Sequence, residues 1–175
     1  MTRFTAPIVH MRFDTPLGPM LAAASGSGLT GLWFENQRHF PVQLASGAWA
    51  IDDGHPVLRA ARRQVLDFLD GKRTGFELPL DLSGGTPFQQ SVWRELLAIP
   101  CGATTTYAAL SRSIGKPQAA RAVGAAVGRN PVSIVVPCHR VLGGDGSLTG
   151  YAGGLERKAA LLRLERQNTK EHTTI

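Results

Sequence analysis

The chain has 175 residues, of which 43% are hydrophobic and 18% charged, a composition typical of a globular protein with one or two small domains. Its two cysteines are too few for a disulfide framework and favour a reducing compartment. It contains no 18-residue apolar run and no N-terminal apolar h-region, which argues against a membrane span and a secretory signal. We therefore expect a cytoplasmic protein.

The first half of the sequence, residues 1–85, predicts an α/β domain with a small antiparallel sheet and one helix. Three short apolar runs separated by turn signals are typical of a meander. Residues 56–70 place apolar side chains at helical spacing, and Gly71 is the predicted stop. Residues 76–82 form a possible edge strand, because Pro79 has no N–H to donate. The three apolar runs are IVHMRF at 8–13, PMLAAAS at 19–25 and LTGLWF at 29–34.

The second half, residues 86–166, predicts a mostly helical domain. Thr86 is a candidate N-cap, Pro87 suits the first helical position, and Pro100 ends that helix. Two short helices follow, one ending at Gly115 and the next starting at Pro117, and their tight connection indicates a helix-turn-helix. The second helix is rich in alanine and glycine, so its smooth face either approaches another backbone closely or packs within the protein.

The last part of the chain predicts four further segments. Residues 132–136 are apolar and indicate a buried strand or extended segment, and residues 143–154 form a glycine-rich loop. Residues 155–166 carry apolar side chains at helical spacing and predict a final helix. Residues 167–175 are polar, and we expect a disordered tail.

The net charge of +6 is confined to the second half. Residues 1–85 carry eight Lys/Arg and eight Asp/Glu, which cancel, whereas residues 86–166 carry ten Lys/Arg and four Asp/Glu. A basic half beside a neutral half favours a polyanionic partner, although a solvated basic surface would give the same count. The basic cluster in the middle of this half consists of Arg112, Lys116, Arg121, Arg129 and Arg140.

Cys138 follows the apolar segment in the sequence Pro-Cys-His-Arg. A cysteine is a nucleophile only as the thiolate, and its free pKa is near ~8.5. A neighbouring imidazole can take the proton, and a cation stabilises the sulfur anion, so His139 and Arg140 are suitable neighbours. Adjacent side chains usually point apart, so a turn or a water would have to join His139 to the sulfur. Glu165, on the final helix, is the candidate carboxylate to orient the imidazole.

The residues alone leave several functions open for Cys138. A buried structural thiol is the plain alternative. Metal binding is a weaker one, because adjacent Cys and His lack ligand spacing and Cys101 is the only other thiol. A reactive Cys138 beside a basic helical module could belong to a cysteine hydrolase built on Cys138, His139 and Glu165, to a redox sensor, or to a protein whose thiol attacks a group on nucleic acid.

At these residues the sequence resembles the O(6)-alkylguanine-DNA alkyltransferases, the methylated-DNA–protein-cysteine methyltransferases, in their bacterial Ogt-like form. The resemblance rests on NPVSIVVPCHRV at 130–141 and covers all of 86–165, while the first half matches loosely through TPLGPMLAAAS at 15–25. It implies a winged helix-turn-helix in the second domain. It also implies direct-reversal DNA repair, in which each molecule acts once and carries the alkyl group from O(6)-alkylguanine, or less readily O(4)-methylthymine, on its own cysteine.

The resemblance also assigns roles to residues. Cys138 would accept the alkyl group, His139 would form the thiolate through water with Glu165 orienting it, and Asn130 would organise the turn. Tyr107 would hydrogen-bond guanine and help drive the nucleotide out of the stack. The DNA-binding residues implied are Arg121, which fills the vacated space, with Ala120, Ala122, Gly124, Lys116 and Arg129. The alkylguanine pocket implied consists of Tyr107, Val127, Val141, Tyr151, Ala152 and Gly153.

The resemblance implies no cofactor, because the displacement requires none. The cysteines of the zinc site found in some relatives are missing here, so we expect no metal. The expected partner is double-stranded DNA with alkylated bases, bound through its minor groove by a protein that is a monomer in solution and could cluster on DNA. A non-catalytic protein that binds alkyl lesions is the alternative within the family, and the presence of Cys138 argues against it.

Overall fold

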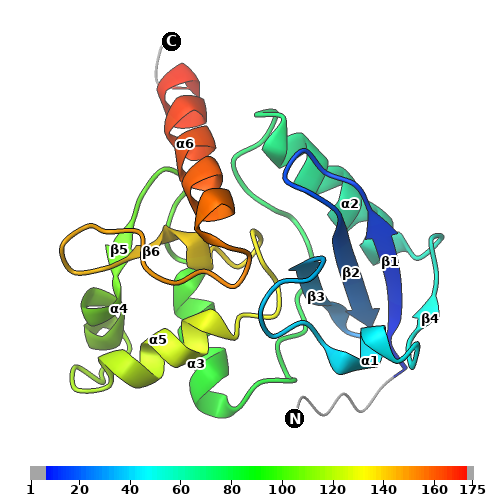
Figure 1. Cartoon of the computed structure of the whole chain (residues 1–175), viewed down its shortest axis with the longest axis horizontal. Coiled ribbons are helices and arrows are strands. Elements are labelled where there is room, and N and C mark those ends of the chain that lie inside the picture. Colours follow the sequence, from blue (N-terminus) through cyan, green and yellow to red (C-terminus); the bar gives the residue numbers. More distant parts are fainter. Residues whose placement is uncertain (1–6, 173–175) are drawn as a thin grey trace.

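The computed structural model describes residues 7–172, with a sheet and α2 on one side and a group of short helices on the other (Figure 1). The sheet has the strand order β3-β2-β1-β4. The predicted meander is confirmed, because β1, β2 and β3 pair antiparallel, and the short parallel strand β4 was not predicted. The strands are β1 (Val9–Phe13), β2 (Met20–Ser25), β3 (Gly28–Phe34) and β4 (Ala50–Ile51).

Helix α2 (Pro56–Leu69) lies against the sheet and buries one apolar face, as its spacing predicts. A four-residue helix, α1 (Val42–Ala45), precedes it and was not predicted. The edge strand predicted at 76–82 is wrong. Only Leu80 makes a bridge, to Leu29, whose backbone N–H donates to Pro79 O at 2.8 Å and whose carbonyl accepts from Asp81 N at 2.9 Å. Pro79 lacks the N–H that a continuing ladder would need.

The second half begins with α3 (Pro87–Leu96), which is capped as its sequence predicts. The Thr86 side chain accepts a hydrogen bond from Gln89 N, and the Gln89 side chain accepts one from Thr86 N, which completes a capping box. Helices α4 (Tyr107–Ser113) and α5 (Ala120–Gly128) form the predicted helix-turn-helix. The second helix starts at Ala120 rather than Pro117, because Ala119 N closes a turn onto Lys116 O at 2.9 Å.

Residues 132–136 are buried, as predicted, but they form neither the strand nor the extended segment that the sequence indicates. These residues form a series of turns, in which Ile134 has a φ of 71°. Among them only Val132 makes a bridge, to Leu32 of β3. A 3-10 turn, η1 (Cys138–Arg140), follows directly. It leads into β6 (Val141–Leu142), which pairs in parallel with β5 (Thr105–Thr106). The turns therefore place Cys138 where the two halves of the chain meet.

The final helix α6 (Leu155–His172) is longer than predicted. Residues 167–172, expected to belong to a disordered tail, are helical, and 173–175 lie outside the described residues. The extra turns have partners in both halves. Asn168 is buried beside Gly71, and Thr169, beside Gly102, donates its hydroxyl to Glu165 O at 2.9 Å. The polar composition of residues 167–172 gave no indication of these contacts.

One hydrophobic core runs through both halves. It joins Phe34 of β3 and Phe68 of α2 to Leu96 of α3, Val136 and Leu161 of α6. Within residues 7–172, no helix has the length and apolar character needed to cross a bilayer. The placement of Cys138 therefore depends on packing between the two halves as well as on its own turn.

Candidate active site

Cys138 occupies the first position of η1 and is 6% exposed. Its exposed part lines a cavity of about 200 Å³ between the halves of the chain. The Asn130 amide nitrogen donates to Cys138 Sγ at 3.1 Å and to Val136 O at 2.8 Å, while Asn130 Oδ1 accepts from Val132 N at 3.0 Å. A single buried amide thus holds both ends of the turn and points a donor at the sulfur.

His139, the residue after Cys138 in η1, forms a fully buried pair with Glu165 of α6. His139 Nε2 lies 2.6 Å from Glu165 Oε1, as the predicted trio requires. Burial would raise the pKa of Glu165, but hydrogen bonds from His139 and Arg140 outweigh it and hold the pKa at about 2. An ionised carboxylate can only accept, so Nε2 carries the proton. Nδ1 is then the basic nitrogen, and it has no hydrogen-bond partner among the described residues.

Burial disfavours the charged forms of both the Cys138 thiol and the His139 imidazole. Burial raises the pKa of Cys138, and the Asn130 hydrogen bond and the positive charge of Lys158 offset this only in part. Burial also lowers the pKa of His139 against the attraction of Glu165. The sequence suggested a thiol made reactive by its neighbours. At the site, burial instead outweighs these neighbours and raises the pKa of the thiol.

Arg140 does not belong to the basic surface on which the sequence placed it. It is 6% exposed, and its guanidinium contacts both oxygens of Glu165 at 2.8 to 3.1 Å and donates to Ile99 O at 2.5 Å. Its contact with Glu165 was not predicted. A buried carboxylate needs a charged or hydrogen-bonding partner. This requirement could have predicted a cationic partner for Glu165 from the sequence.

Lys158 of α6 is a second residue that the sequence analysis missed. It is fully buried, and its ammonium donates to Val141 O at 2.6 Å, Thr149 O at 2.9 Å and Gly150 O at 3.1 Å. Three accepting carbonyls match the three donors of a protonated lysine. Lys158 lies two helical turns before Glu165, on the same buried face of α6 as Leu161 and Leu162. A lysine at helical spacing among apolar residues was the feature of the sequence that could have indicated it.

The cavity in front of Cys138 gathers most of the predicted pocket residues. Tyr107 is half-buried and donates its hydroxyl to Thr149 O at 3.1 Å. Val141 and Gly153, predicted for the pocket, do not line the cavity. Val141 lies buried behind it, and Gly153 is enclosed by Phe34 and Tyr151. The predicted residues that line the cavity are Tyr107, Gly124, Val127, Arg129, Cys138, Tyr151 and Ala152.

Two residues of the first half, Arg38 and His39, also line this cavity and were not predicted. The loop that carries them is fixed to the glycine-rich loop at 143–154, which we call the active-site loop, because Arg38 N donates to Ala152 O at 3.1 Å. Nothing local in the sequence marks them, since the contact joins positions more than 100 residues apart.

The predicted DNA-binding residues lie on and around α5, and two of them, Gly124 and Arg129, also line the cavity. Arg121 and Ala122 are exposed, Ala120 is partly exposed, and Val123, Ala126 and Val127 bury the other face. Lys116 and Arg129 are exposed at the two ends of the helix. The exposed face of α5 is thus smooth except for one long cationic side chain. Among the described residues, no three His, Cys, Asp or Glu side chains lie close enough to hold a metal ion.

Two family models match almost the whole chain. The model described as 6-O-methylguanine DNA methyltransferase, DNA binding domain, matches residues 87–167, and the ribonuclease-like domain of the same family matches residues 8–82. The chain belongs to the 6-O-methylguanine DNA methyltransferase family. The methylated-DNA–protein-cysteine methyltransferase of Mycobacterium tuberculosis is 44% identical over 169 residues, covering 96% of this chain and 99% of the relative. That of Methanosarcina barkeri is 44% identical over 157 residues, covering 90% and 96%.

Solved structures of this family have the same fold. A crystal structure of Mycobacterium tuberculosis OGT in complex with DNA superposes with a TM-score of 0.83 at 44% identity, covering 91% of this chain and 94% of that one. The O6-methylguanine-DNA methyltransferase of Pyrococcus kodakaraensis gives a TM-score of 0.66 at 25% identity, covering 90% and 98%. The family membership expected from the Pro-Cys-His-Arg segment is therefore confirmed across both halves, including the loosely matching first one.

Proposed function

We propose that this protein repairs O(6)-alkylguanine in double-stranded DNA, and O(4)-methylthymine less readily, by moving the alkyl group irreversibly onto Cys138. The observation that carries the proposal is the position of the sulfur. Cys138 lines the cavity, the Asn130 amide donates to its Sγ at 3.1 Å, and the next residue, His139, is paired with Glu165 at 2.6 Å. Membership of a methyltransferase family makes an alkyl group the natural electrophile.

The proposed reaction is one displacement. The sulfur attacks the alkyl carbon, the new C–S bond forms as the C–O bond breaks, and the electron pair of that bond stays with guanine. The thiol proton passes through water to His139 Nδ1, and Glu165 stabilises the imidazolium that results. The thioether has no good leaving group, so each molecule acts once.

Guanine leaves as an anion unless it receives a proton or a hydrogen bond. Tyr107 lies in the cavity wall with its hydroxyl toward the active-site loop, and it is the proposed donor to the departing base. Burial raises the pKa of the Tyr107 phenol, which keeps its proton available at neutral pH. The hydrogen bond to Thr149 O would be exchanged for one to guanine when the base enters.

The damaged base must leave the duplex before a buried sulfur can reach it, at a cost of a few kcal/mol. The face of α5 supports this step. Its small side chains suit close approach to a minor groove, and the exposed Arg121 suits the negative potential there and can occupy the space that the base vacates. We therefore infer that a monomer binds alkylated duplex DNA through α5, with Lys116 and Arg129 on phosphates.

Intact-protein mass spectrometry after incubation with a duplex that contains O(6)-methylguanine tests the proposal. We expect one methylene unit of added mass, mapped to Cys138, and no turnover beyond one equivalent. The Cys138→Ala variant should bind the duplex and gain no mass. Transfer to Cys101 or repeated turnover would overturn the proposal. Tight binding without added mass would favour a lesion-binding protein, and catalytic ester cleavage would favour a hydrolase.

A further inference from the structure

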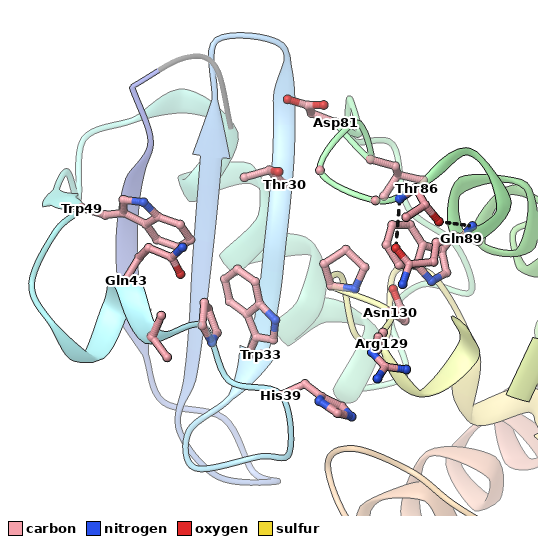
Figure 2. A pocket seen from close by; sticks show the side chains of 17 residues that line it. Thr30, Trp33, His39, Gln43, Trp49, Asp81, Thr86, Gln89, Arg129 and Asn130 are labelled. Carbon is pink, nitrogen blue, oxygen red and sulfur yellow. Dashed lines mark hydrogen bonds between the residues drawn. The ribbon is translucent and has the colours of Figure 1, made fainter. Parts of the chain in front are cut away.

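A second and larger cavity, of about 440 Å³, lies between the two halves of the chain. Figure 2 shows Trp33 at its centre, Trp49 at one end, Thr86 and Gln89 at the other, and His39 with Arg129 at one edge. All three tryptophans of the chain line it, because Trp93 forms part of its wall as well. The proposed transfer to Cys138 does not use this cavity, which we call the interdomain cavity.

The interdomain cavity adjoins the cavity of Cys138. His39 and Arg129 line both of them. Asn130 also lines the interdomain cavity, while its amide nitrogen donates to Cys138 Sγ at 3.1 Å. The two spaces are therefore separated by a few side chains, of which His39 and Arg129 are both exposed and end in rotatable groups.

The sizes of the two cavities differ in a way that bears on the substrate. Pockets that hold drug-sized ligands measure about 300–1,000 Å³. The Cys138 cavity, at about 200 Å³, lies below that range, and the interdomain cavity, at about 440 Å³, lies within it. A base with a methyl group suits the first cavity alone, whereas a base with an aryl-bearing alkyl group needs more room.

The walls of the interdomain cavity suit an aromatic group with a polar end. Trp33 and Trp49 stack with ring centroids 6.2 Å apart. Thr30 is 1% exposed, and its hydroxyl has no hydrogen-bond partner among the described residues. Aromatic walls with one free polar group are typical of sites for planar organic ligands.

We propose that the interdomain cavity receives the distal part of bulky arylalkyl groups, such as benzyl and biphenylmethyl, when they are transferred from guanine O6 to Cys138. The inference rests on the proposed function. In the proposed function the base enters the cavity from the side of Tyr107 on α4 and Gly124 on α5. The wall contributed by the first half is then left for the remainder of the alkyl group. That remainder passes His39 and Arg129 and lies along Trp33.

Single-turnover rates with duplexes that carry O(6)-methyl-, O(6)-benzyl- or O(6)-biphenylmethylguanine test this route. Gln43 lines only the interdomain cavity, and Gln43→Phe fills part of it. We expect this variant to transfer methyl within twofold of the wild-type rate and biphenylmethyl at least about tenfold more slowly, the scale of a badly fitting apolar group. Gln43→Ala, the matched control, should not slow biphenylmethyl transfer. His39→Gly, which suits its φ of 61°, should raise the ratio of biphenylmethyl to methyl transfer.

Tryptophan fluorescence gives a second readout, because every tryptophan of the chain lines the interdomain cavity. Transfer of a nitro-substituted biphenylmethyl group should strongly quench tryptophan emission, and transfer of methyl should leave it nearly unchanged. Methyl transfer without biphenylmethyl transfer, equal rates in the two Gln43 variants, or an unquenched nitroaryl adduct would each overturn the inference and leave the proposed function standing. Failure of methyl transfer would instead overturn the proposed function.

Discussion

The guanidinium of Arg140 holds the carboxylate of Glu165, with Nε at 3.1 and 2.9 Å from its two oxygens and Nη2 at 2.8 Å from Oε1. Both side chains are buried, so the pair is screened very little by solvent. The contact favours the ionised form of Glu165 and holds Oε1, the oxygen that His139 Nε2 also contacts at 2.6 Å. Arg140 is therefore a positioning residue for the imidazole, although it lies two positions from the cysteine.

Removing Arg140 should destabilise the fold strongly. Arg140→Met leaves a buried carboxylate without its guanidinium partner, and breaking a buried pair in this way costs about 3–5 kcal/mol. Arg140→Lys keeps the charge, loses the forked geometry and should cost less. Urea unfolding at pH 7 measures both. An Arg140→Met protein as stable as the wild type would show that the pair contributes little.

The Glu165 carboxylate should make stability fall in acid. Its folded pKa of about 2 lies below the ordinary value of 4.5, so the unfolded chain binds the proton more tightly. The stabilisation is complete above about pH 5 and is lost as the pH falls toward 2, by an amount on the order of 3 kcal/mol. The lowered pKa of His139 acts in the same direction, beginning below its ordinary value of 6.5.

The Glu165→Gln variant tests this assignment. Its free energy of unfolding, measured by urea titration from pH 6 to pH 3, should vary less with pH than that of the wild type. Asp145 offers a control, because it is an exposed carboxylate on the glycine-rich loop whose lowered pKa comes from Ser147. Asp145→Asn should keep the steep dependence. Equal slopes for wild type and Glu165→Gln would place the acid-sensitive group elsewhere.

The features that the sequence predicted correctly depend on local signals. The start of α3 was predicted from Thr86 and Pro87, and in the structure Gln89 completes the cap. The pairing of His139 with Glu165 was expected because few carboxylates exist in the second half, and Glu165 lies on the final helix, a rigid element able to hold it. Local chemistry was sufficient to predict the cap, and the small number of carboxylates was sufficient to predict the pair.

The features that were missed depend on long-range contacts or on ambiguous patterns. Arg38 reaches the cavity only because the loop after β3 bonds to Ala152. The apolar residues 132–136 satisfied a strand pattern, which does not distinguish a strand from other buried segments. The side chain of Asn130 explains why no strand forms there. It donates a hydrogen bond to Val136 O and accepts one from Val132 N, and a strand would have paired these backbone groups with a neighbouring strand.

Arg121 should matter for DNA and not for a free base. If it fills the space left by the extruded nucleotide, Arg121→Ala should slow transfer from duplex DNA by about ten- to a hundredfold, in line with a flipping cost of a few kcal/mol. Transfer from free O(6)-benzylguanine should stay within twofold. Arg112, also exposed and basic, provides the control for charge alone. Equal effects of Arg121→Ala and Arg112→Ala on duplex repair would show that Arg121 contributes only to phosphate attraction.

Lys158 should lower the pH at which Cys138 reacts. Its ammonium opposes the rise in the pKa of the thiol that burial causes. Lys158→Gln removes the charge and keeps donors, whereas Lys158→Met removes both. Both should therefore move the pH midpoint of methyl transfer upward, and Lys158→Met should lose more stability, because three buried carbonyls lose their donor. An unchanged midpoint would show that the charge does not reach the sulfur.

Asn130 should affect the sulfur and the turn separately. Asn130→Asp keeps the size of the side chain and its acceptor for Val132 N, but places a carboxylate oxygen opposite Cys138 Sγ, where the amide now donates at 3.1 Å. The like charge should disfavour the thiolate, raise the midpoint of the pH–rate profile and slow transfer at pH 7 by about a hundredfold or more. Asn130→Ala removes every bond of the side chain, so it should lose more of the fold, by about 1–3 kcal/mol for each buried group left unsatisfied. Stopped-flow transfer from pH 6 to pH 10, with urea unfolding of the same variants, separates the two effects. If Asn130→Asp reacted as fast as the wild type at every pH, the amide would serve only to hold the turn.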